Sequence, residues 1–152
     1  MKIHIFYRHF NISGNDFKGR PEWFNFEKCF LNLLSSIENK DATLHLVMDG
    51  DVTTNFINKF ADKYTLHSIK AGEDQSSFWQ TWKIVKEQDI PEGDLIYFLE
   101  NDYLHTGDWV DKTVEIFKTF SGLNYISLYD HNDKYFLPVY EELASKIFTT
   151  PS

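Results

Sequence analysis

Two hydrophobic patterns alternate along the chain and predict an order of strands and helices. Short apolar runs over residues 3–9, 43–48, 64–69, 94–99 and 124–129 predict five strands. Apolar residues spaced three and four positions apart predict helices around residues 21–37, 53–60, 76–85, 107–117 and 139–147. The first helix is expected to open at Pro21, because proline is tolerated in a first helical turn.

The order of these elements predicts the fold class. Strands that alternate with helices favour an α/β fold, in which a mostly parallel central sheet carries helices on both faces in three layers. Right-handed crossovers bring the carboxyl ends of parallel strands to one edge of the sheet, where ligands of such folds bind. The chain is long enough for a single domain, 1–152, and contains no linker or internal repeat.

Net charge, cysteine content and the length of apolar runs limit the binding partners and cellular locations that we expect. The formal net charge of −8 disfavours nucleic acid and anionic membranes, which bind basic surfaces. Cys29 is the only cysteine, so a disulfide framework is excluded and a buried thiol is expected. No apolar run approaches the roughly 20 residues that cross a bilayer, and the N-terminal residues do not form a signal peptide. A cytoplasmic protein without a transmembrane segment is therefore expected.

Polar side chains are concentrated where the predicted strands end. The first, second and fourth strands end in Tyr7-Arg8-His9, Asp49-Gly50-Asp51 and Glu100-Asn101-Asp102. The third strand leads into Gly72-Glu73-Asp74. Because parallel strands end at one edge, we expect these residues to share that edge.

The triplet Glu100-Asn101-Asp102 carries the most specific chemistry in this set. It follows an almost wholly apolar strand, and its two neighbouring carboxylates repel each other unless a cation compensates them. Mg²⁺ and Mn²⁺ prefer oxygen ligands and share their shell with substrate phosphates. The triplet therefore predicts a Mn²⁺ or Mg²⁺ site; the alternative is a solvated acidic loop.

Three short segments resemble the nucleotide-diphospho-sugar transferases of the glycosyltransferase-A fold. They are Val47-Met48-Asp49-Gly50-Asp51, Ser76-Ser77-Phe78-Trp79 and Tyr97-Phe98-Leu99-Glu100-Asn101-Asp102. The element order of residues 1–130 also follows that Rossmann-like fold. The Glu-Asn-Asp triplet is similar to the DXD motif of the family, in which the first residue is usually Asp.

The resemblance implies a metal-dependent glycosyltransferase of the hexosyltransferase type, or its donor-binding domain. Asp102 would hold a Mn²⁺ or Mg²⁺ that bridges the two phosphates of a nucleoside-diphosphate sugar, and Glu100 would act as the second metal residue. The nucleotide-sugar-binding residues that it implies are Tyr7, Arg8, Asp49, Asp51, Glu100 and Asn101. Arg8 could also pair with a phosphate through two hydrogen bonds.

The resemblance implies that the acceptor half of such an enzyme is short or missing in this sequence. The family's catalytic base usually follows the fifth strand, where this sequence offers Asp130 and His131 as candidates. The acceptor, a glycan or another hydroxyl compound, is not identified by the sequence, and neither is the oligomeric state.

Other functions fit parts of the sequence. A sugar nucleotidyltransferase would share the fold, but Ser13-Gly14-Asn15 is a poor match to its glycine-rich basic loop. A non-catalytic nucleotide-sugar binding or assembly module would fit the short C-terminal part. A phosphotransfer protein would need an aspartate at the end of the first strand, where Tyr7-Arg8-His9 stands.

Overall fold

The computed structural model of the chain describes residues 1–10 and 20–129. The strands are β1 (Ile3–Phe10), β2 (Ala42–Asp49), β3 (Thr65–Ile69) and β4 (Leu95–Glu100). The α-helices are α1 (Phe26–Ile37), α2 (Asp74–Glu87) and α3 (Trp109–Thr119), and two 3-10 helices are η1 (Val52–Thr54) and η2 (Phe56–Lys63). The chain divides into two compact units, Met1–Val114 and Glu115–Ser152, and the sheet belongs to the first.

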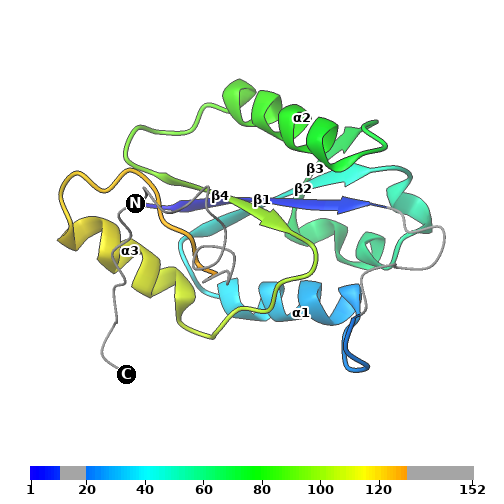
Figure 1. Cartoon of the computed structure of the whole chain (residues 1–152), viewed down its shortest axis with the longest axis horizontal. Coiled ribbons are helices and arrows are strands. Elements are labelled where there is room, and N and C mark those ends of the chain that lie inside the picture. The colour runs from blue at the N-terminus through cyan, green and yellow to red at the C-terminus, as the bar shows by residue number, and fades with distance from the viewer. Residues whose placement is uncertain (11–19, 130–152) are drawn as a thin grey trace, which may run out of the picture. The chain divides into compact units, whose positions relative to one another are not determined.

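The four strands form one sheet in the order β3-β2-β1-β4, and every neighbouring pair is parallel. The predicted α/β architecture with a parallel sheet is therefore confirmed. The chain first builds outward from β1 through β2 to β3, and then returns to the other side of β1 to form β4 (Figure 1). The order of the strands thus reverses between β1 and β4.

Alternate residues of β1 face opposite sides of the sheet, as the strand period requires. Ile5 and Tyr7 pack into a core that contains Phe30 of α1, whereas Phe6 packs with Val85 of α2. Consequently, α1 and α2 cover opposite faces of the sheet, as Figure 1 shows.

The start of α1 differs from the prediction. The helix begins at Phe26 rather than at Pro21, which lies in a turn closed by a hydrogen bond from the Phe24 amide to the Pro21 carbonyl at 2.9 Å. Asn25 is the N-cap, and its side-chain oxygen accepts from the Lys28 amide at 2.6 Å. The cap supplies a partner for an amide that a helix start otherwise leaves unpaired, so it fixes the boundary better than the proline does.

Two further predictions about elements were wrong. Residues 124–129 do not form the expected fifth strand, and Tyr125 among them is 82 % exposed. The helix expected around residues 53–60 is split into η1 and η2, because Asn55 ends the first and caps the second through the Ile57 amide at 3.1 Å. The helix expected around residues 139–147 lies outside the described residues.

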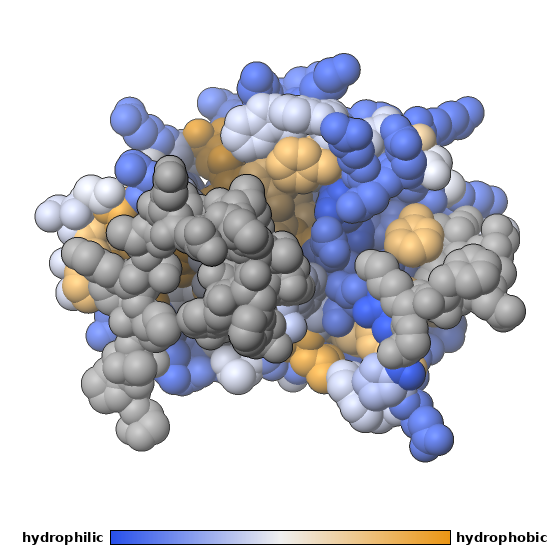
Figure 2. All heavy atoms as spheres, viewed as in Figure 1, coloured by the Kyte–Doolittle hydropathy of each residue, from blue (hydrophilic) through white to orange (hydrophobic). Residues whose placement is uncertain are grey.

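An apolar surface runs along α2 on the side of β4. The rings of Phe78 and Trp82 lie 5.7 and 5.5 Å from that of Phe98 on β4, and Ile96 on the same strand is 41 % exposed. Figure 2 shows hydrophobic surface below α2 in this region. Within the described parts of the chain, no helix has the length and apolar character needed to cross a membrane.

Candidate functional site

The carboxyl ends of β1 and β4 bring the predicted residues of the triplet and of the first strand together. Arg8 of β1 is in register with Glu100 of β4, so Asn101 and Asp102 follow directly beside the end of β1. Asp49 lies on the other side of β1, where it is in register with Phe10. The edge that the sequence predicts therefore exists, with the triplet on one side of β1 and Asp49 on the other.

Arg8 is held between two carboxylates from different elements. Its Nη2 lies 2.5 Å from Oε1 of Glu100, and its Nη1 lies 2.9 Å from Oδ1 of Asp74 in the first turn of α2. The Asp74 carbonyl also accepts from Nη1 at 3.2 Å. The Arg8 side chain is only 11 % exposed, so these contacts fix its guanidinium at the edge of the sheet.

Asp102 is paired with a different arginine. Nη1 of Arg20 lies 2.8 Å from Oδ2 of Asp102, and both side chains are largely buried. The Arg20 guanidinium also lies over the ring of Phe24, 4.5 Å from its centroid. Sequence reasoning missed Arg20, because it stands outside any periodic segment and its partner is far away along the chain.

Asn101, the middle residue of the triplet, points into the protein. Its side chain is buried, and its amide nitrogen donates to Nδ1 of His9 at 3.0 Å. Burial lowers the pKa of His9 to about 4, so the imidazole is neutral at pH 7 and accepts this bond. The three residues of the triplet thus have three different partners: Arg8, His9 and Arg20.

Tyr7 lies in the core rather than at the surface. It is 1 % exposed and packs against Phe30, and its hydroxyl has no hydrogen-bond partner among the described residues. Burial is the main cause that raises the Tyr7 pKa, and the charges of Cys29 and Asp102 add to it. Asp102 therefore lies close enough to the core for its charge to act on Tyr7.

Asp49 and Asp51 hold local structure. The Asp49 carboxylate accepts from the amides of Ala71 and Gly72 at 3.1 and 2.8 Å, which ties β2 to the loop before α2. Asp51 caps η1 by accepting from the Thr53 amide at 2.8 Å and from its hydroxyl at 2.7 Å, and these bonds lower the Asp51 pKa. Asp130 and His131 lie outside the described residues.

This edge of the sheet carries the carboxylate oxygens that Mg²⁺ or Mn²⁺ prefers, but only a few of them. The part of the chain that the structure describes holds no group of three or more histidine, cysteine or acidic side chains arranged for a metal. Mg²⁺ is usually bound through one or two carboxylates together with substrate phosphates. Asp102 or Glu100 could each supply one such carboxylate, provided that the cation replaces the arginine that it now contacts, and the two acids contact different arginines.

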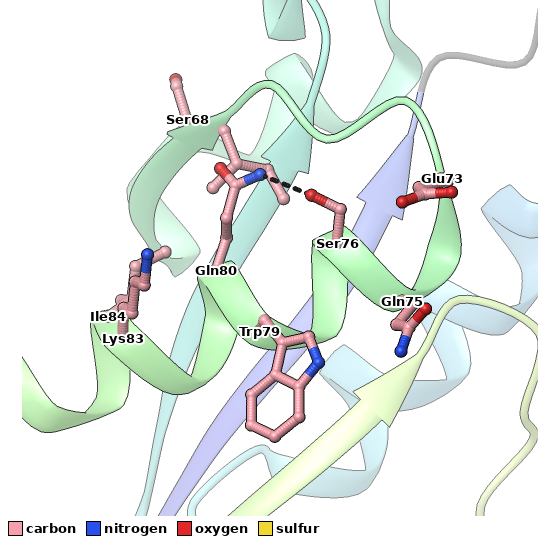
Figure 3. Close-up of a pocket in the computed structure, with 9 residues that line it drawn as sticks. Ser68, Glu73, Gln75, Ser76, Trp79, Gln80, Lys83 and Ile84 are labelled. Carbon is pink, nitrogen blue, oxygen red and sulfur yellow. Dashed lines mark hydrogen bonds between the residues drawn. The ribbon is translucent and has the colours of Figure 1, made fainter.

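A groove of about 650 Å³ lies apart from the triplet, over α2 and β3. Figure 3 shows Gln80 and Ser76, whose side chains are hydrogen-bonded at 3.2 Å, and the indole of Trp79 projecting from the same helix. Glu73, which also lines the groove, directly precedes Asp74. The groove therefore begins next to the partner of Arg8, but it contains no residue of the triplet.

Comparison with known proteins gives no relative: no family model, no curated protein and no solved structure matches this chain.

Proposed function

We propose that the chain is a nucleotide-sugar-binding domain of a metal-dependent glycosyltransferase, with a three-layer, Rossmann-like fold of the glycosyltransferase-A type. The proposal depends mainly on the position of Glu100-Asn101-Asp102, which leaves β4 beside the end of β1. In open parallel sheets, ligands bind outside the carboxyl ends of the strands at the point where the strand order reverses.

Different residues at this point would bind different parts of a nucleoside diphosphate and its metal. Asp102 and Glu100 would hold Mg²⁺ or Mn²⁺, which acts as a Lewis acid toward the oxygens of the leaving diphosphate when it is bound. Arg8 supports the same charge, because a guanidinium pairs with phosphate through two parallel hydrogen bonds. Asp74 positions Arg8 by its ion pair at 2.9 Å.

Asn101 contributes by fixing the main chain between the two acids. Its buried hydrogen bond to His9 joins the end of β4 to the end of β1. Transfer also needs a base for the acceptor hydroxyl. Asp130 and His131 remain the candidates for that role.

The proposal is tested by calorimetric titration of the whole chain with a panel of nucleoside-diphosphate sugars, in the presence of Mn²⁺, Mg²⁺ or EDTA. We expect at least one donor to bind only with the metal, and Asp102→Asn to weaken that binding by about tenfold or more, which is 1.4 kcal/mol. Asp89→Asn is the matched control, since Asp89 is an exposed acid in the loop after α2. Metal-independent binding, or equal binding by Asp102→Asn, would contradict the proposal.

The products distinguish transfer from the synthesis of an activated sugar. Released nucleoside diphosphate indicates a glycosyltransferase, whereas pyrophosphate formed from a nucleoside triphosphate and a sugar phosphate indicates a nucleotidyltransferase. Donor binding without either product would identify a binding module.

A further inference from the structure

Two histidines from neighbouring strands meet on the face of the sheet that α2 covers. His45 of β2 is in register with Thr65 of β3, and Val47 is in register with His67. Since side chains two positions apart on a strand share a face, His45 and His67 are diagonal neighbours on one face. Val47 lies on the same face and packs with Val85 of α2. The pair is separate from the triplet, because β1 lies between them in the sheet.

A nitrogen of one imidazole faces a nitrogen of the other. Nδ1 of His45 lies 3.0 Å from Nε2 of His67, and the ring centroids are 5.3 Å apart, so both nitrogens lie between the rings. Two nitrogens that bind one zinc ion at about 2.0–2.1 Å with tetrahedral angles are roughly 3.3 Å apart. In the square-planar geometry typical of Cu²⁺ and Ni²⁺ they are roughly 2.9 Å apart. The separation therefore suits a shared ion.

To hold that ion, each ring has to turn by roughly 35–45° so that its lone pair is aimed beside the line between the nitrogens. His67 is only partly buried and lies on β3, which has one neighbour among the described strands, so its ring has room to turn. The His45 ring is stacked on Phe6 with centroids 4.5 Å apart. A turn of this ring within its own plane keeps the stacking.

The two imidazoles can also offer their lone pairs without losing a proton to solvent. Burial lowers the pKa of both, to about 4 for His45, so both rings are neutral at pH 7. A neutral imidazole carries one N–H, so one of the facing nitrogens donates and the other accepts. A metal requires that the donating ring moves its proton to its other nitrogen. Nε2 of His45 has no hydrogen-bond partner among the described residues, so no bond at that atom opposes the change.

From this contact we propose that Nδ1 of His45 and Nε2 of His67 bind a transition metal ion of the class Zn²⁺, Cu²⁺ and Ni²⁺. Imidazole nitrogens suit these ions, whereas Mg²⁺ prefers oxygen ligands. Within the described residues no third histidine, cysteine or acid joins the pair as a ligand, so water fills the other positions. The charge of Glu87 acts on His67, and this acid would attract a cation to the pair. The site does not depend on the proposed function.

The proposal is tested by titrating Zn²⁺ into the whole chain and following the imidazole nitrogens by ¹⁵N NMR. We expect saturable changes at Nδ1 of His45 and Nε2 of His67, which EDTA reverses and an equal concentration of Mg²⁺ does not produce. The melting temperature should rise with Zn²⁺, because the ion binds the folded chain and joins β2 to β3. His67→Asn is expected to weaken Zn²⁺ binding by about tenfold or more in calorimetry, since loss of even an outer-shell partner has an effect of that size.

His105→Asn is the matched control. It also removes a histidine, but one whose Nε2 lies 3.0 Å from the Tyr97 hydroxyl instead of a second imidazole. It should keep the Zn²⁺ affinity of the unchanged protein. Should His67→Asn fail to fold, the assigned nitrogens of the unchanged protein decide the question.

Three results would overturn the site: equal Zn²⁺ binding by His67→Asn, changes confined to other histidines, or changes that do not saturate. Each of them would leave the Mn²⁺ or Mg²⁺ site of the proposed function untouched, because that site consists of carboxylates on the other side of β1.

Discussion

At the scale of single residues, the side chains of Glu100, Asn101 and Asp102 point in three different directions. Glu100 faces Arg8 and the first turn of α2, Asn101 is buried against His9, and Asp102 reaches Arg20 near Tyr7. The sequence predicts that two acids end a buried strand, but it does not predict their partners. Those contacts join segments that are far apart in the sequence, so a local sequence pattern cannot predict them.

Asn101 provides a test at this scale. Asn101→Ala removes the donor to Nδ1 of His9, which lies 3.0 Å away, and leaves a buried acceptor unpaired. We expect the free energy of unfolding to fall by about 1–3 kcal/mol, as measured by urea denaturation. Substitution of the exposed Asn58 by alanine serves as the comparison and should change stability by less than about 0.5 kcal/mol. An equal loss in both variants would argue against the bond to His9.

At the scale of elements, the strands that pair in the sheet were predictable and their order was not. The apolar runs that precede Asp49 and Glu100 are short and sharply bounded, so they predict β2 and β4 well. A similar run at residues 124–129 forms no strand, so an apolar run alone does not establish one. Strand order is set by crossovers, and the reversal between β1 and β4 could not be inferred from spacing.

Asp49 shows how one element depends on another. Its carboxylate holds the amides of Ala71 and Gly72, and the loop that contains them leads directly to Asp74, the partner of Arg8. Asp49→Ala is expected to lower the free energy of unfolding by roughly 2–4 kcal/mol, since two bonds to a charged acceptor are lost.

Hydrogen exchange at the two amides checks this explanation. The amides of Ala71 and Gly72 should exchange faster in Asp49→Ala than in the unchanged chain, because their acceptor is gone. Asp51→Ala removes the cap of η1, so its cost should be about 0.5–2 kcal/mol and these amides should keep their protection. Unchanged exchange in Asp49→Ala would show that the bonds do not hold the loop.

At the scale of the whole molecule, buried neutral histidines make stability depend on pH. Burial lowers the pKa values of His9, His45 and His105 to about 4, whereas an unfolded histidine titrates near 6.5. The unfolded chain therefore binds more protons between these values, and stability falls as the pH falls from about 6.5 to about 4. For His9 alone the loss is at most about 3 kcal/mol.

His45→Phe tests this pH dependence. The His45 ring is stacked on Phe6 with centroids 4.5 Å apart, and its Nδ1 lies 3.0 Å from Nε2 of His67. Phenylalanine can keep the stacking, and it removes the group that titrates together with the bond to His67. We expect the midpoint of thermal unfolding to vary less between pH 7 and pH 4.5 in the variant than in the unchanged chain. An identical slope would exclude His45 as a contributor.

The place of β4 at one end of the sheet has a consequence for handling the purified chain. Among the described strands β4 has a neighbour on one side only, and it carries Ile96 and Phe98 toward the apolar surface beside α2. Unpaired backbone groups next to apolar side chains are a template on which further polypeptide can add as a strand. Concentrated samples are therefore expected to self-associate along β4, so storage calls for dilute solutions.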